Sequence, residues 1–266
     1  MTYQFIEKQV YVNELKISYL EGGIATTSEP ILFLHGWGVG IEPYQEVVDS
    51  LCGSYQVIAP YLPGFGKSSG SDLNWNYDNY ANFIISFLNK LNIKKVHLIG
   101  HSLGGGIGVT LAASMPNIIK SLILVDSTGI PVEHLPFILV QRTIEMTAQA
   151  AQIQFPQIIQ VFQGFFYNFL FRTEHTIQTL LLAVEKDLKK LLPKIESPCL
   201  LVWGKNDLTT PLSAGEQFCE SIKDSQLIVV DGVYHEWSIF FVDKFTEKMG
   251  LKPCRSTTAF SSSLDL

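Results

Sequence analysis

The chain has 266 residues, of which 47% are hydrophobic and 17% charged, and its formal net charge is −6. This length fits one large α/β domain or two modest ones, and the composition is that of a globular protein, not a disordered one. The acidic balance and the absence of any basic cluster longer than a lysine pair exclude nucleic acid as an expected partner, because binding phosphates needs gathered Lys and Arg.

The N-terminal sequence contains no signal peptide, and no uninterrupted apolar stretch is long enough to cross a bilayer. The cysteines are scattered and lack the spacing of metal ligands. We therefore expect a cytoplasmic, reduced protein with no membrane span and no bound metal. The sequence leaves the oligomeric state open.

Apolar runs of strand length alternate with helix-like segments along the chain. The runs at 4–12 and 15–21 predict an antiparallel hairpin with its turn at Asn13 and Glu14. Later runs are continuously apolar over four to six residues, which is typical of strands buried on both faces of a parallel sheet. These runs lie at 30–36, 55–63, 95–100, 121–127, 198–204 and 226–232.

Three segments have the pattern of helices. Residues 77–93 place their large apolar side chains on one stripe, and residues 213–222 and 237–250 predict two more helices. The stripe consists of Tyr80, Phe83, Ile84, Phe87, Leu88 and Leu91. Strand–helix alternation of this kind predicts an α/β fold with a doubly wound, mostly parallel sheet of about eight strands.

The alternation breaks between residues 130 and 192, which we call the cap segment. It contains no strand-like run, and its long middle part is almost uncharged. An insertion of this size between two strands predicts a helical cap over the edge of the sheet, with the core formed by 1–129 and 193–251. Residues 252–266 are Ser-rich and aperiodic, and predict a disordered tail.

The cap segment is rich in aromatic residues. Most of them are expected to pack the cap onto the core, but their number indicates that some line a substrate cavity. The candidates for this lining are Phe162, Phe165, Phe166 and Phe169.

A serine lies between two glycines at the seam between an apolar run and a small-residue helical run. Residues 100–104 read Gly-His-Ser-Leu-Gly and match the pattern G-x-S-x-G. In this motif the serine occupies a strained strand-to-helix turn, and the flanking glycines leave room for backbones that approach too closely for a Cβ. The strand before it and the helix after it favour a nucleophilic Ser102 over a helix-capping serine.

A serine nucleophile needs a general base, and His235 fits this role best. It follows the last apolar run, so its loop can reach the same sheet edge as Ser102. His97 lies inside a strand and His101 lies on the wrong side of the tight turn. The remaining candidates considered, His134 and His175, belong to the cap segment.

The base in turn needs an orienting acid. Asp207 follows the run at 198–204, which gives the chain order Ser102, Asp207, His235 expected for this arrangement. The alternative acid is Asp126, which follows the run after the nucleophile. Otherwise Asp126 is a helix or turn cap.

An oxyanion site would complete this apparatus. The sequence Phe-Leu-His-Gly-Trp-Gly-Val-Gly at 33–40 follows a buried strand, and its glycines allow the loop to curl towards the nucleophile. The backbone N–H groups of Trp37 and Leu103 are the expected pair of donors. An ordinary glycine-rich turn is the alternative interpretation.

Together these motifs resemble the α/β-hydrolase fold family over residues 3–251. The resemblance rests on "LHGWG" at 34–38, "LPGFGKS" at 62–68, "GHSLGG" at 100–105, "WGKND" at 203–207 and "YHEW" at 234–237. Within the family the chain is similar to the capped group of esterases, C–C bond hydrolases, haloperoxidase-like enzymes, epoxide hydrolases and dehalogenases. The last two use an aspartate nucleophile, against which Ser102 argues. The C–C bond hydrolases often carry Asn where this chain has His101.

The resemblance and the motifs imply a serine hydrolase of small to medium apolar acyl compounds, most simply a carboxylesterase, with a small-molecule substrate and no cofactor. The same residues could cleave C–C bonds of diketo acids, hydrolyse thioesters or carry out perhydrolysis. A diketo acid would need a cation from the cap segment, where Arg142 and Arg172 are the available arginines. A ligand receptor with little turnover is the alternative from a different class.

Overall fold

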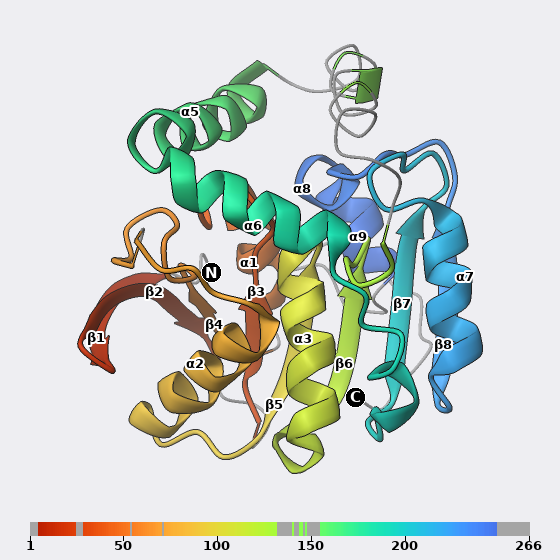
Figure 1. Cartoon of the computed structure of the whole chain (residues 1–266), viewed down its shortest axis with the longest axis horizontal. Coiled ribbons are helices and arrows are strands. Elements are labelled where there is room, and N and C mark those ends of the chain that lie inside the picture. Colours follow the sequence, from red (N-terminus) through yellow and green to blue (C-terminus); the bar gives the residue numbers. More distant parts are fainter. Residues whose placement is uncertain are drawn as a thin grey trace.

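The computed structural model describes residues 5–24, 29–53, 55–70, 72–131, 140, 144–145, 147 and 155–248, with the backbone alone for 155–162. At its centre is an eight-stranded sheet with the order β1-β2-β4-β3-β5-β6-β7-β8 (Figure 1). The strands are β1 (Ile6–Val12), β2 (Leu15–Gly23), β3 (Ile31–Leu34), β4 (Gln56–Pro60), β5 (Val96–His101), β6 (Ile119–Val125), β7 (Cys199–Gly204) and β8 (Ser225–Val230). From β4 to β8 every neighbouring pair is parallel, which confirms the predicted fold class.

The predicted opening hairpin is confirmed. Strands β1 and β2 are antiparallel with Val12 opposite Leu15, so two residues form the turn. Those residues, Asn13 and Glu14, have φ values of 47° and 68°. Two successive positive φ values are typical of the tight turns that match the twist of a hairpin, and asparagine tolerates them well.

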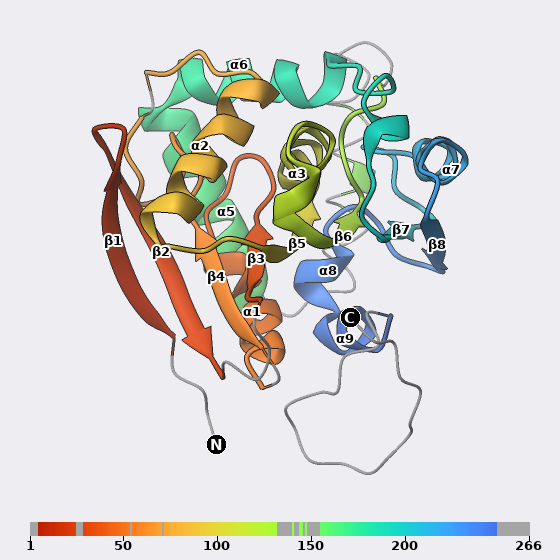
Figure 2. The same ribbon diagram turned by 90° about the horizontal axis from the view of Figure 1, so that it is seen from below.

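Helices cover both faces of the sheet, as Figure 2 shows from below. Helices α2 (Tyr77–Lys90), α3 (Leu103–Ser114) and α7 (Leu212–Ser221) lie on one face, and α1 (Gln45–Leu51), α8 (Trp237–Phe240) and α9 (Val242–Lys248) on the other. Side chains of successive residues in a strand therefore pack into two different apolar layers, one on each face of the sheet. Leu98 packs with the first layer and Ile99 with the second. This two-sided burial explains why the strands read as continuous apolar runs.

Helix α2 confirms the predicted apolar stripe but is shorter than the pattern indicated. Asn76 and Asn79 form a reciprocal capping box at its start, and the helix ends at Lys90 with Leu91 as its C-cap. The side chains at 80, 83, 84, 87 and 88 are all buried. The predicted extension to residue 93 is wrong because Asn92 takes a positive φ of 58°, which ends the helix.

The predicted single helix at 237–250 is also wrong over its described residues, where α8 and α9 are separated by Phe241 with φ −122° and ψ 61°. Eight residues of unbroken helix would place Trp237 and Phe245 about 12 Å apart along its axis. The break brings their ring centroids to 6.1 Å within one core. Helix α1, with the 3-10 turn η1 (Glu42–Tyr44) before it, has no counterpart among the predicted elements.

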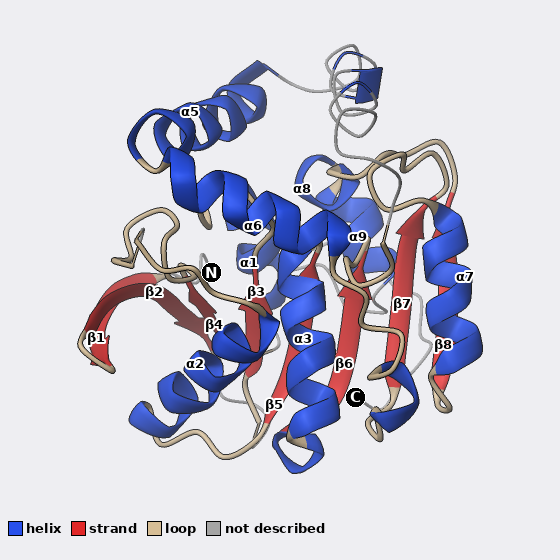
Figure 3. Ribbon diagram, in the orientation of Figure 1, coloured by secondary structure: helices blue, strands red, loops and turns tan. Residues whose placement is uncertain are grey.

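The described part of the cap segment contains two long helices, α5 (Phe155–Phe171) and α6 (Thr173–Glu185), and the 3-10 turn η3 (Leu192–Lys194) begins at its last residue. Figures 1 and 3 place α5 and α6 across the carboxyl ends of the parallel strands. Here Trp37 Nε1 donates to the Thr176 carbonyl at 2.8 Å and Arg172 donates to the Gly64 carbonyl at 2.8 Å. The division into core and cap stays a prediction, and the predicted tail lies outside the described residues.

Helix α3 approaches the sheet so closely that two of the motif's glycines have no room for a side chain. A Cβ at Gly100 would lie 2.5 Å from the Gly104 carbonyl oxygen. A Cβ at Gly104 would collide with the Leu34 carbonyl oxygen and lie 2.8 Å from that of His35. These atoms are backbone and cannot move aside, which confirms the steric reason for glycine at both positions.

We expect Gly104→Ala to lower the free energy of unfolding by about 1–3 kcal/mol or more, because overpacking against a fixed backbone strains the fold. Gly164→Ala in α5 is the matched control, since the nearest atom to a new Cβ there is 3.7 Å away. This control should keep or raise stability by up to about 1 kcal/mol, the helix-propensity gain of alanine. Urea unfolding of both variants measures the difference, and a Gly104→Ala variant as stable as the parent would contradict the argument.

Candidate active site

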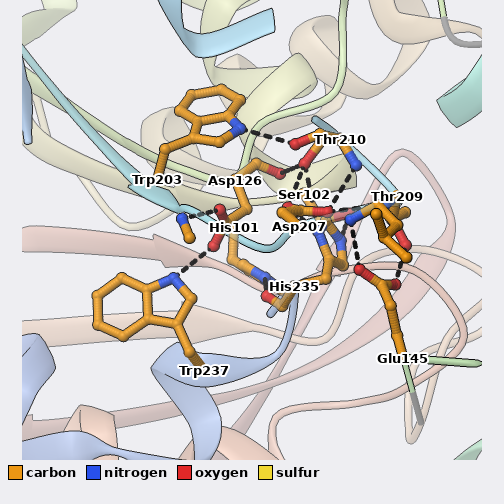
Figure 4. A network of polar contacts seen from close by, with 12 residues as sticks. His101, Ser102, Asp126, Glu145, Trp203, Asp207, Thr209, Thr210, His235 and Trp237 are labelled. Atoms are coloured by element: carbon orange, nitrogen blue, oxygen red, sulfur yellow. Dashed lines mark hydrogen bonds and ion pairs between the residues drawn. The ribbon is translucent and has the colours of Figure 1, made fainter. Parts of the chain in front are cut away.

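The structure brings Ser102, His235 and Asp207 into one hydrogen-bonded row, shown in Figure 4. The Ser102 Oγ lies 2.9 Å from His235 Nε2, and His235 Nδ1 lies 2.7 Å from Asp207 Oδ2. The three residues follow β5, β8 and β7, whose carboxyl ends share one edge of the sheet. All three side chains are buried. Because a carboxylate only accepts, the His235 proton lies on Nδ1 and leaves Nε2 free to accept the serine proton.

The backbone of Ser102 is held in a strained conformation, with φ 52° and ψ −117°. Strain of this kind costs about 1–3 kcal/mol at a non-glycine residue and persists only where the surroundings impose it. Here the Ser102 N–H donates to the Val125 carbonyl, while the Ser102 carbonyl accepts from the N–H groups of Gly105, Gly106 and Thr128. These bonds fix the turn from both sides and hold Oγ at the sheet edge.

The Asp207 carboxylate accepts four hydrogen bonds, which fix its orientation. Oδ1 accepts the N–H groups of Thr209 and Thr210, each at 2.8 Å. Oδ2 accepts the Thr210 hydroxyl and His235 Nδ1, each at 2.7 Å. Sequence reasoning did not single out Thr210, although an aspartate whose side chain bonds the backbone two and three residues onward is a recognisable turn signal.

Asp126, the alternative acid, lies nearby but has other partners. Its Oδ1 accepts the Gly204 N–H at 2.8 Å, and its Oδ2 accepts Trp237 Nε1 at 2.6 Å. Full burial, and next the charge of Asp207, hold the pKa of Asp126 well above its ordinary value. The residue that the structure places against His235 Nδ1 is therefore Asp207.

Glu145 of the cap segment contacts the loop that carries Asp207. It is completely buried, its Oε1 accepts the Leu208 N–H at 2.5 Å, and its Oε2 accepts the Thr209 hydroxyl at 2.6 Å. The sequence gives no signal for this contact, because it joins segments more than sixty residues apart. A buried carboxylate with two donors holds this loop from the side of the cap segment.

The two expected oxyanion donors lie on elements that border the row. Leu103 is the first residue of α3, so its N–H has no acceptor within the helix. Trp37 follows Gly36 in the loop after β3, and its ring packs edge-on against Phe165, with centroids 5.3 Å apart. The role of both N–H groups stays a prediction.

The aromatic candidates of the cap segment differ in their surroundings. Phe165 is brought to Trp37, whereas the side chains of Phe166 and Phe169 are 63% and 51% exposed. The side chain of Phe162 lies outside the described residues. The part of these four residues in substrate binding stays a prediction.

Two other histidines, His35 in the loop after β3 and His101 next to Ser102, are buried and held neutral. Burial lowers the pKa of His35 to about 4 and that of His101 to about 3. His35 Nε2 accepts the Leu62 N–H at 3.0 Å, which a protonated ring could not do. His97 bonds the Ser121 hydroxyl at 2.7 Å within the sheet, as expected of a core histidine. His134 lies outside the described residues.

In the described part of the chain, no three His, Cys, Asp or Glu side chains gather as metal ligands would. None of the helices described combines the length and the apolar character that a bilayer crossing requires.

The chain is similar in sequence to proteins of one known family. Residues 29–186 match a protein family described as the alpha/beta hydrolase fold. The 2-hydroxy-6-oxo-6-(2'-aminophenyl)hexa-2,4-dienoic acid hydrolase of Metapseudomonas resinovorans is 24% identical over 253 residues, 88% of this chain and 86% of that enzyme. Lipase 3 of Moraxella sp. (strain TA144) is 28% identical over 236 residues, 79% of this chain and 72% of the lipase.

Solved structures show the same fold. The meta-cleavage product hydrolase of Pseudomonas fluorescens IP01 superposes with a TM-score of 0.77 at 19% identity, covering 91% of this chain and 95% of that enzyme. At this identity the likeness supports the fold and leaves the chemistry to the site itself.

The two neutral histidines predict loss of stability in mild acid. The pKa values of His35 and His101 are lower in the folded chain than the ordinary 6.5. The stability that these neutral rings contribute is therefore fully present above about pH 6.5 and is lost as the pH falls. Between pH 7 and pH 5 each should remove about 2 kcal/mol from the free energy of unfolding. Urea unfolding of His35→Gln should show a pH dependence smaller by that amount. Parallel curves, or a wild-type His35 that titrates above pH 5 by NMR, would contradict the assignment.

Proposed function

Because this chain belongs to the alpha/beta hydrolase fold family, we propose that it is a serine hydrolase that cleaves small to medium apolar acyl esters. The observation that carries the proposal is the row in which Ser102 Oγ, His235 and Asp207 are joined at 2.9 Å and 2.7 Å. A nucleophile, a base within hydrogen-bond reach and an acid that orients the base are the parts that acyl transfer needs.

In the proposed reaction Ser102 Oγ attacks the ester carbonyl carbon while His235 Nε2 takes the hydroxyl proton. Asp207 accepts the Nδ1 hydrogen throughout, which stabilises the imidazolium that forms. When the tetrahedral intermediate collapses, the C–O bond breaks and His235 returns the proton to the departing alkoxide. Water, activated by the same histidine, then hydrolyses the acyl-Ser102 ester.

The negative charge on the carbonyl oxygen would be met by the N–H groups of Trp37 and Leu103. A preorganised donor of this kind contributes about 2.7–4 kcal/mol to lowering the barrier. Gly36, next to Trp37, already donates to Tyr44 Oη at 3.0 Å. Its N–H is therefore committed to the loop's own structure and is not the proposed donor.

An apolar acyl group fits the residues beside this site better than a charged one. Trp37 and Phe165 pack together at the base of the cap segment, and α5 carries no charged residue between 155 and 171. Selection among acyl lengths is expected to be gradual, since one methylene contributes about 1–3 kcal/mol to discrimination.

C–C bond hydrolysis of a diketo acid is the second candidate, favoured by the similarity to the dienoic acid hydrolase over most of the chain. Such a substrate carries a carboxylate that calls for a cation. The guanidinium of Arg172 is held by the Gly64 carbonyl and lies over the Tyr167 ring, 5.6 Å from its centroid. Arg142 lies outside the described residues. Arg172 is thus already engaged in contacts within the fold and is not needed to bind a substrate carboxylate. This favours the ester over the diketo acid as substrate.

We expect the wild-type chain to hydrolyse p-nitrophenyl esters and Ser102→Ala to lose all turnover while remaining folded. A C2 to C12 acyl series measures both the activity and the preferred acyl length. Ser127→Ala is the matched control, because this buried neighbouring hydroxyl bonds the Thr128 carbonyl and not His235. Full activity of Ser102→Ala would refute the proposal. Silence of the wild type on every ester, with turnover of a dienoic diketo acid, would establish the second candidate instead.

The two buried carboxylates predict different kinetic losses. Asp207→Asn should lower kcat by roughly 10⁴-fold, because an amide at this position favours the wrong histidine tautomer. Asp126→Asn should cost far less, since Asp207 still holds His235 Nδ1. Steady-state kinetics on the best ester compares them. The opposite order of losses would make Asp126 the acid.

A further inference from the structure

His101, the residue before the nucleophile, lies in a buried hydrogen-bond chain that crosses the active site. Its Nδ1 is 2.7 Å from Tyr44 Oη, and its Nε2 is 3.0 Å from the carbonyl oxygen of His235. Tyr44 Oη also accepts the Gly36 N–H at 3.0 Å. The chain thus joins the loop after β3, the end of β5 and the loop after β8.

The direction of every bond in this chain follows from its ends. The His235 carbonyl can only accept, so His101 carries its proton on Nε2. The Nδ1 of a neutral ring is then an acceptor, and Tyr44 donates to it. The Gly36 N–H can only donate, and it meets the remaining lone pair of Tyr44 Oη. Each donor faces one acceptor, so the chain has a single consistent arrangement.

Both side chains are buried, His101 at 3% exposure and Tyr44 at 1%. Among the described residues, the charges of His235, Glu236 and Asp207 act on His101, and the Tyr44 hydroxyl bonds its Nδ1. Desolvation outweighs all of them and holds the pKa of His101 near 3, so the ring carries no charge beside His235. A neutral ring here leaves the imidazolium that forms on His235 without a repelling neighbour, at a ring-centroid distance of 5.1 Å.

We propose that His101 is a positioning residue: it holds the backbone of His235 at a fixed place relative to the Gly36–Trp37 loop. Asp207 orients the His235 ring, but a ring is placed by its backbone as well. The His101 bond to the His235 carbonyl supplies that second constraint and carries it through Tyr44 to the proposed oxyanion donor. The inference rests on the proposed function only for its kinetic readout.

Two substitutions separate the two ends of the ring. Glutamine places an amide NH₂ where His101 Nε2 lies, three bonds from Cβ, so His101→Gln can keep the donor to the His235 carbonyl. Asparagine places an amide oxygen where Nδ1 lies, so His101→Asn can keep the acceptor for Tyr44 but has no group to reach His235. His97→Asn is the matched control, because His97 is a buried histidine on the same strand whose ring Nδ1 bonds the Ser121 hydroxyl and not the active-site row.

We expect His101→Asn to lower kcat for p-nitrophenyl ester hydrolysis by about 10- to 100-fold with KM unchanged, the loss typical of a misplaced catalytic group. His101→Gln should keep most of its kcat, and His97→Asn should lose stability without losing kcat. Equal losses of kcat in the Gln and Asn variants, parallel to their losses in thermal stability, would reduce His101 to a packing role and overturn the proposal.

A measurement that needs no turnover keeps this inference separate from the proposed function. The NMR signal of the His235 Nδ1 proton, which is bonded to Asp207, should shift in His101→Asn and stay in place in His101→Gln. In the wild type, ¹⁵N shifts should show His101 neutral with its proton on Nε2. A wild type without esterase activity but with these signals would reject the proposed function alone, and an unshifted signal in both variants would reject the positioning role.

Discussion

The left-handed backbone of Ser102 is the constraint on which the rest of the site depends. A φ of 52° at a serine is unfavourable in isolation, so the neighbouring chain must impose it. Strand β5 lies between β3 and β6 in the sheet, and α3 begins directly after the serine. Helix α3 lies so close to the Leu34 backbone that residue 104 has no room for a side chain. The turn therefore exists because a helix and a sheet meet almost backbone to backbone, and it places the buried Oγ within hydrogen-bond reach of His235.

The parallel order of the sheet explains why distant residues meet at this turn. The loops after β3, β5, β6, β7 and β8 all begin at one edge and carry the Trp37 loop, Ser102, Asp126, Asp207 and His235 respectively. Asp126 has a distinct part in this convergence. It bonds Gly204 at the end of β7 and Trp237 just beyond His235, so one carboxyl group ties together the two loops that carry the acid and the base. Its elevated pKa follows from full burial beside Asp207.

Local patterns predicted the features that depend on local sequence. Continuous apolar runs predicted the buried strands. The positions where those strands end predicted the order of Ser102, Asp207 and His235. What the sequence did not predict depends on contacts between distant segments. The contacts of Glu145 with Thr209 and of Tyr44 with His101 join residues 64 and 57 positions apart in the sequence. The break at Phe241 is likewise decided by the core that Trp237 and Phe245 share, not by propensity.

The cap segment is hydrogen-bonded to two of the loops at the proposed site. Thr176 and Asn168 bond the loop after β3 at Trp37 and Gly38, and Glu145 bonds the loop after β7. These are the loops that carry the proposed oxyanion donor and the proposed acid. A displacement of the cap segment would have to break these bonds or move the loops with it. The position of both loops therefore depends on the cap segment as well as on the sheet.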